Sequence, residues 1–118
     1  MELAVSIVGY VLAAAFIVAG GAKLARVKMM RDNFARYGFP DWFLRVVGAG
    51  EVVGGILLLF PAFAIFGATG LAVIMVGAVI THIMCKEAPM AVPALVLLGA
   101  SVFTLVGHAQ DFAQMVSA

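Results

Sequence analysis

The chain has 118 residues, of which 65% are hydrophobic and only 11% are charged, and its mean hydropathy is +1.19. Soluble domains balance apolar and polar residues far more evenly, so this composition excludes an ordinary water-soluble protein. The formal net charge of +1 is too small for a nucleic-acid-binding protein. The single cysteine, Cys85, has no partner in the chain for a disulfide, a CxxC redox pair or a cysteine-rich metal site.

The first apolar segment covers residues 3–22 and contains no charge. A helix of this length reaches about 30 Å, the thickness of a bilayer's hydrocarbon core, so the segment predicts a transmembrane helix. A cleaved signal peptide carries positive charge before its apolar run, whereas here Glu2 precedes the run and Lys23 follows it. We therefore expect the segment to remain in the protein.

Three more apolar segments follow, at residues 43–60, 63–85 and 91–107. Their connections, around Pro61 and at residues 86–90, have room only for tight turns, so consecutive helices must be antiparallel. The sequence thus predicts an all-α, polytopic membrane protein. We expect one domain over residues 1–118, an antiparallel bundle of four transmembrane helices.

The connection at residues 23–42 is long enough for structure of its own. Apolar side chains alternate there with charged ones, the apolar set being Met29, Met30, Phe34 and Tyr37 and the charged set Lys28, Arg31, Asp32 and Arg36. This pattern predicts a short amphipathic helix at the membrane interface, between the first and second spans. Gly38 and Pro40 then end it and turn the chain into the second span.

Positive charge is concentrated at one end of the predicted bundle. Six of the seven basic residues lie in or beside the first connection, and the seventh, Lys86, lies in the third. The positive-inside rule places both connections in the cytoplasm and both termini outside, in a multi-pass protein of the inner (plasma) membrane. These basic residues either serve only to fix the topology or also bind anionic lipid headgroups.

Glu51 is the residue that a membrane should exclude, because it falls near mid-bilayer in the second span. Helical side chains lean toward their own N-terminus, so Lys23 and His82 should lean inward while Glu51 leans toward the cytoplasmic face. We therefore predict a buried cluster of Lys23, Glu51 and His82, with Thr81 as a further donor. The alternative is a plain Lys23–Glu51 ion pair that fixes helix packing, with His82 a capped interfacial residue.

Small residues flank the predicted cluster. Gly48 and Gly55 lie three residues before and four residues after Glu51, on the same helix face, so that face is either a close helix contact or a cavity. Tyr10, midway along the first span, needs a partner for its hydroxyl and is expected to face the interior, on the outer wall of the same cavity. The candidate ligand-binding residues are thus Lys23, Glu51, His82, Tyr10, Thr81, Gly48 and Gly55, with no metal site.

The order and spacing of several short motifs resemble the DoxX-like family of small four-helix membrane proteins. The matching features are Gly20 to Leu24, Phe34 with Gly38-Phe39-Pro40, Gly48, Glu51 and Gly55, and Ala78 with His82. The resemblance implies a compact four-helix bundle and links to thiosulfate oxidation at the quinone pool, membrane redox complexes or, in a eukaryotic branch, receptor assembly. The chain lacks the cysteine pair of MauE-like relatives, which argues against dithiol chemistry.

The sequence leaves two candidate functions of different classes. It contains no recognisable catalytic motif, so it does not decide whether either function involves a reaction. The first is binding of a small apolar molecule between the helices, a quinone or other isoprenoid lipid, in a redox-associated role, with Lys23, Glu51 and His82 supplying charge and protons. The second is a non-catalytic assembly factor or accessory subunit that grips another membrane protein. Glycine-rich faces would also permit a homo-oligomer.

Overall fold

The computed structural model describes the backbone of residues 2–117. Side chains are described for this range except at Glu2, Ala88, Gln110, Asp111, Phe112, Gln114, Met115 and Ser117. The described chain is all helical, in the order α1 (Glu2–Leu24), α2 (Lys28–Arg36), α3 (Asp41–Leu58), α4 (Ala64–Met84), the 3-10 turn η1 (Ala88–Met90) and α5 (Ala91–Ser117). The predicted all-α class is confirmed.

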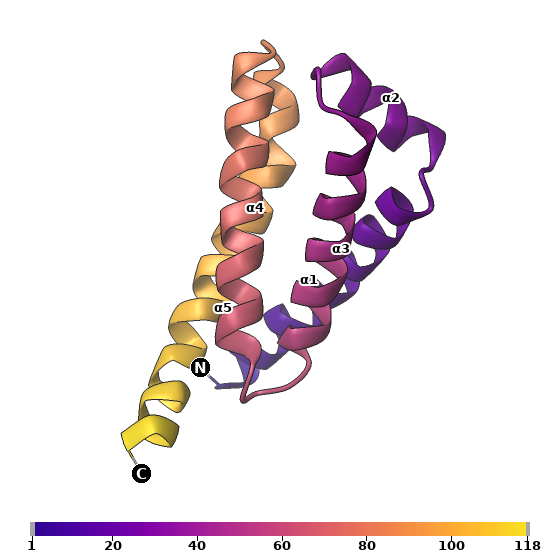
Figure 1. Cartoon of the computed structure of the whole chain (residues 1–118). Helices are drawn as coiled ribbons and strands as arrows, with labels where there is room; N and C mark the ends of the chain where they lie inside the picture. The colour runs from indigo at the N-terminus through magenta and orange to yellow at the C-terminus, as the bar shows by residue number, and fades with distance from the viewer. Residues whose placement is uncertain (1, 118) are drawn as a thin grey trace.

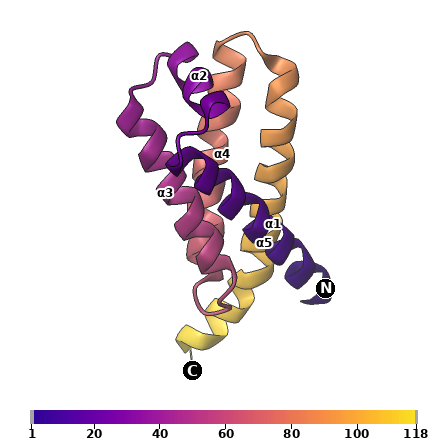
Figure 2. The same cartoon turned by 90° about the vertical axis from the view of Figure 1, so that its right-hand side faces the viewer.

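The long helices form two antiparallel pairs, and α2 lies across one end (Figure 1). The most extensive contacts join α1 to α3 and α4 to α5, while α3 with α4 and α1 with α5 connect the two pairs. Figure 2 shows that α1 begins and α5 ends away from α2, at the opposite end of the bundle. Leu12, Phe16, Leu58, Leu71 and Met75 form the core where the pairs meet.

Three of the described helices are long and apolar enough to cross a membrane, at Leu3–Leu24, Ala64–Met84 and Ala91–Ala109. The remaining long helix, α3, has 18 residues and carries Asp41, Arg45 and Glu51, so its role as a fourth span stays a prediction. Helix α5 continues ten residues beyond the predicted end at Gly107, to Ser117. Gly107 lies inside this helix at a close contact with α1, where a Cβ would meet Val5 Cγ2 at 2.5 Å.

Helices α1 and α4 end in the same way, near α2. Arg26 and Lys86 take left-handed backbone conformations, with φ of 55° and 61°. The amide of the next residue then donates to a carbonyl five residues earlier, which is the Schellman pattern. Val27 N donates to Ala22 O at 3.1 Å, and Glu87 N donates to His82 O at 2.8 Å. Glycine usually occupies this position because it has no side chain to oppose a positive φ.

Helices α1 and α3 touch backbone to backbone through a pair of glycines. A Cβ on Gly20 would lie 2.6 Å from Gly48 O, and a Cβ on Gly48 would lie 2.9 Å from Gly20 O and 2.8 Å from Lys23 Cβ. Small residues at a helix crossing permit two backbones to approach this closely. The approach brings the side chains of Lys23 and Glu51, which neighbour the glycines, within contact distance.

We expect Gly48→Ala to lower the free energy of unfolding by about 1–3 kcal/mol, because the two backbones must separate to admit the methyl group. Gly21→Ala is the matched control, since nothing lies within 4 Å of a Cβ there. Unfolding in mild detergent, followed by helical circular dichroism, measures both variants. Equal stability of the two would contradict the close contact.

Candidate functional site

The structure brings Lys23 and Glu51 together, as the lean of their side chains predicts. Lys23 Nζ, in the last turn of α1, lies 2.7 Å from Glu51 Oε1, in the middle of α3. The two side chains are 13% and 2% exposed. A carboxylate this deeply buried needs a compensating charge, and the ammonium supplies it within the same chain.

The glycine-flanked face of α3 is a close helix contact, the first of its two predicted alternatives. Gly48 packs on Gly20 and on the stem of Lys23. A Cβ on Gly55 would meet Ile17 Cγ1 at 2.8 Å and Ala13 O at 3.0 Å. Helix α1 therefore fills the space beside both glycines that a bound molecule would need.

The prediction that His82 and Thr81 join Lys23 and Glu51 is wrong. His82 Nδ1 lies 3.3 Å from the Tyr37 hydroxyl and 3.5 Å from Glu87 Oε2, and the Thr81 hydroxyl donates to Gly77 O at 2.8 Å. The tilt of a side chain toward the N-terminus of its helix predicts its level along the helix axis. It does not predict the direction in which the side chain points around that axis. Helices α1 and α4 do not pack against each other within the described part of the chain.

The prediction that Tyr10 faces the interior is also wrong, because its side chain is 58% exposed. It borders a hollow of about 40 Å³ with Leu58, Leu59 and Pro61, at the end of the bundle away from Lys23. The buried positions of α1 are Val5, Gly9, Leu12, Ala13, Phe16 and Gly20. This spacing leaves position 10 outside the buried stripe, and the sequence does not mark the stripe because α1 is apolar on nearly every side.

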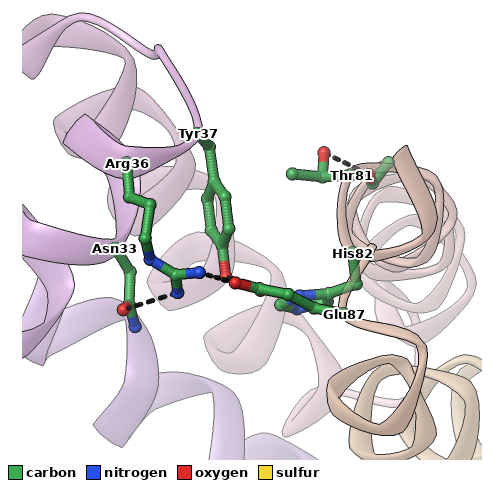
Figure 3. Close-up of polar contacts among 7 residues, drawn as sticks. Asn33, Arg36, Tyr37, Thr81, His82 and Glu87 are labelled. Carbon is green, nitrogen blue, oxygen red and sulfur yellow. Dashed lines mark hydrogen bonds and ion pairs between the residues drawn. The ribbon is translucent and has the colours of Figure 1, made fainter. Parts of the chain in front are cut away.

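A polar network joins α2 to the end of α4, and we call it the α2 latch: Arg36, Tyr37, His82 and Glu87. Arg36 forms an ion pair with Glu87, and the Tyr37 hydroxyl donates to Glu87 Oε2 at 3.1 Å. Figure 3 shows Arg36 and Tyr37 reaching from one side toward His82 and Glu87 on the other. No residue of α2 is buried, so these contacts do much to hold the helix in place.

Sequence reasoning missed the latch because it treated Tyr37 as part of an apolar face and Glu87 as a turn residue. One signal was available. Arg36 ends α2, Tyr37 follows it, and Glu87 lies three residues after the end of α4, so the antiparallel topology places all three at the same end of the bundle.

A cavity of about 250 Å³ lies beneath α2, against the end of α1 and the start of α3, and we call it the α2 cavity. Its lining residues are Arg26, Arg31, Asp32, Phe34, Ala35, Phe39, Asp41 and Leu44. The Phe34 and Phe39 rings stand 5.8 Å apart and form an apolar wall with Leu44. Charged side chains supply the rest of the lining, so the cavity is amphipathic.

The charges of the α2 cavity are unequally paired. Asp41 accepts a hydrogen bond from Arg26 Nε at 2.9 Å and forms a 3.2 Å ion pair with Arg45. The side chains of Arg31 and Asp32 make no hydrogen bond or ion pair within the described residues. The described residues also contain no group of three His, Cys, Asp or Glu that could hold a metal ion.

Three helices long and apolar enough to span a membrane, packed in an all-helical bundle around a buried ion pair, are the features of an integral membrane protein. The family model described as the DoxX-like family matches residues 7–104, and the chain belongs to that family. It is also similar to the uncharacterized protein YdgD of Bacillus subtilis (strain 168), with 32% identity over 110 residues, covering 87% of this chain and 96% of the relative. No solved structure matches the chain.

We expect Lys23→Met or Glu51→Met alone to lower the free energy of unfolding by about 3 kcal/mol, because each leaves one buried charge without its partner. The double variant should recover most of that loss. Arg45→Met, at a pair more than 40% exposed on both sides, should cost less than about 1 kcal/mol. Additive losses in the double variant, measured by unfolding in detergent, would mean that the two charges do not interact.

We expect Glu87→Gln to speed hydrogen exchange of the α2 amides by about tenfold, because it removes the charge that holds Arg36 and Tyr37. Lys86→Gln is the control, as Lys86 has no ion pair among the described side chains. Mass-spectrometric hydrogen exchange in nanodiscs reports both. Unchanged α2 protection in Glu87→Gln would show that the latch does not hold this helix.

Proposed function

We propose that this protein binds a small amphipathic molecule, with an apolar body and a polar head, in the α2 cavity. Isoprenoid quinones and membrane lipids both belong to this class. The observation that carries the proposal is the lining of the cavity. Its volume is about 250 Å³, and it is lined by the apolar residues Phe34, Phe39 and Leu44 together with charged residues. Ligand sites combine apolar walls with a few polar groups in the same way.

The position of the cavity supports this function. It lies where the apolar helix α1 gives way to Arg26 and the charged α2, the depth at which a lipid-like molecule changes from tail to head. In this proposal α3 is a fourth span, α2 lies at the membrane interface, and the basic end faces the cytoplasm.

The Lys23–Glu51 pair has a positioning role in this proposal, in place of the ligand contact predicted from sequence. It ties the end of α1, three residues before Arg26, to the helix that carries Asp41 and Leu44. Arg26 lines one side of the cavity, and Asp41 and Leu44 line another. The ion pair and the Gly20–Gly48 contact would therefore set the width of the cavity. A redox association, as predicted from the family resemblance, requires that the bound molecule be a quinone.

A second candidate is an accessory subunit or assembly factor for another membrane protein. It is favoured by α4, whose Gly70 and Gly77 are exposed with nothing within 4 Å of a Cβ, on either side of the exposed Val73. Helices associate in membranes through such small residues. Glu51 is buried and paired with Lys23 of the same chain, so a partner would meet this glycine face and not the carboxylate.

Native mass spectrometry of the full chain in mild detergent tests the proposal. We expect a retained small molecule in the native chain and its loss in Ala35→Leu, which places a larger side chain in the cavity lining. Ala49→Leu, also exposed but outside the cavity, should retain it. Equal retention in all three chains would refute binding in the α2 cavity, and a co-purifying protein in place of a small molecule would favour the second candidate.

A further inference from the structure

The α2 cavity has charge of both signs to offer a ligand. Asp41 is already shared by Arg26 and Arg45, which neutralises its carboxylate. Arg26 uses Nε for this bond, so its two terminal nitrogens remain as donors. Arg31 adds a second guanidinium and Asp32 a carboxylate, both without an ion pair among the described residues. The cavity thus presents two donor groups and one acceptor.

This set of groups suits a phosphate that carries an amine. Guanidinium groups bind phosphate oxygens through paired, charge-assisted hydrogen bonds, which Arg26 and Arg31 can supply. A protonated primary amine would satisfy Asp32. A phosphate alone would leave Asp32 unpaired beside a second negative charge, and a quinone head would leave both Arg31 and Asp32 without a charged partner. A quaternary ammonium has no N–H to donate.

The size of the cavity indicates how much of the ligand it encloses. Pockets that surround a whole drug-sized ligand measure roughly 300–1,000 Å³. A cavity of about 250 Å³ is smaller than this range and is open to its surroundings, so it fits a head group. Phe34, Phe39 and Leu44 would then meet the first carbons of the apolar part, while the rest stays in the bilayer.

We propose that the α2 cavity binds a phosphoethanolamine group, with the phosphate on Arg26 and Arg31 and the amine on Asp32. This inference rests on the proposed function, because it names the ligand class of the same cavity. The group can come from a membrane lipid or from a soluble phosphate ester. The same two arginines and one aspartate would recognise both, and only the lipid would also use the apolar wall.

Native mass spectrometry with added ligands tests the inference on the full chain in mild detergent. The probes are phosphatidylethanolamine, phosphatidylcholine and phosphatidylglycerol with identical acyl chains, soluble phosphoethanolamine, and a short-tailed ubiquinone. We expect phosphatidylethanolamine to be retained best. Arg31→Gln and Asp32→Asn should each weaken its retention by about fivefold, the effect of one solvent-exposed charge pair. Lys28→Gln is the matched control, since it removes one positive charge from α2 outside the cavity.

The outcomes separate this inference from the proposed function. Preferred retention of phosphatidylglycerol, or an Asp32→Asn variant with unchanged lipid preference, would overturn the role of the amine. Preferred binding of ubiquinone would overturn the phosphoethanolamine assignment and leave the amphipathic-ligand function standing. Retention of soluble phosphoethanolamine equal to that of the lipid would support the assignment with a soluble source. Retention of none of the probes, with Ala35→Leu equal to the native chain, would overturn both proposals.

Discussion

A buried carboxylate in an apolar helix bundle is the constraint on which this structure depends. Glu51 is 2% exposed and can remain there only because Lys23 reaches it from the neighbouring helix. That reach requires α1 and α3 to approach until Gly20 and Gly48 touch, since bulkier residues would hold the two charges apart. The ion pair and the glycine contact are thus two parts of one helix crossing.

This crossing also determines what lies at the basic end of the molecule. Arg26 lies two residues after the end of α1 and Asp41 begins α3, so fixing the two helices positions both partners of the 2.9 Å hydrogen bond between Arg26 and Asp41. The short helix α2 spans the gap between them and is held from the other side by Glu87 and His82. The α2 cavity is lined by residues of this helix, of the turn that follows α1 and of the start of α3. A ligand there would contact groups that the Lys23–Glu51 crossing and the latch hold in place.

Periodicity and charge position allowed the all-α class and the helix order to be predicted, along with the Lys23–Glu51 pair. The position of a residue along its helix follows from counting residues, which is why these two charges were matched correctly. Direction around the helix axis does not follow from counting, and for this reason His82 and Tyr10 were misplaced. The α2 cavity was beyond prediction because it depends on how α2 folds over the ends of α1 and α3. The angle between α2 and the two longer helices depends on contacts among all three segments, so it cannot be predicted from any one of them.

The most direct test is a dipolar-coupling measurement by solid-state NMR on the protein in bilayers, with 15N at lysine Nζ and 13C at glutamate Cδ. The chain has three lysines and three glutamates, so single variants assign each signal. A Lys23–Glu51 contact of 2.7 Å predicts a strong coupling that disappears in Lys23→Gln and persists in Lys28→Gln and Lys86→Gln. A Glu51 signal with no lysine coupling would contradict the buried pair and the helix crossing built on it.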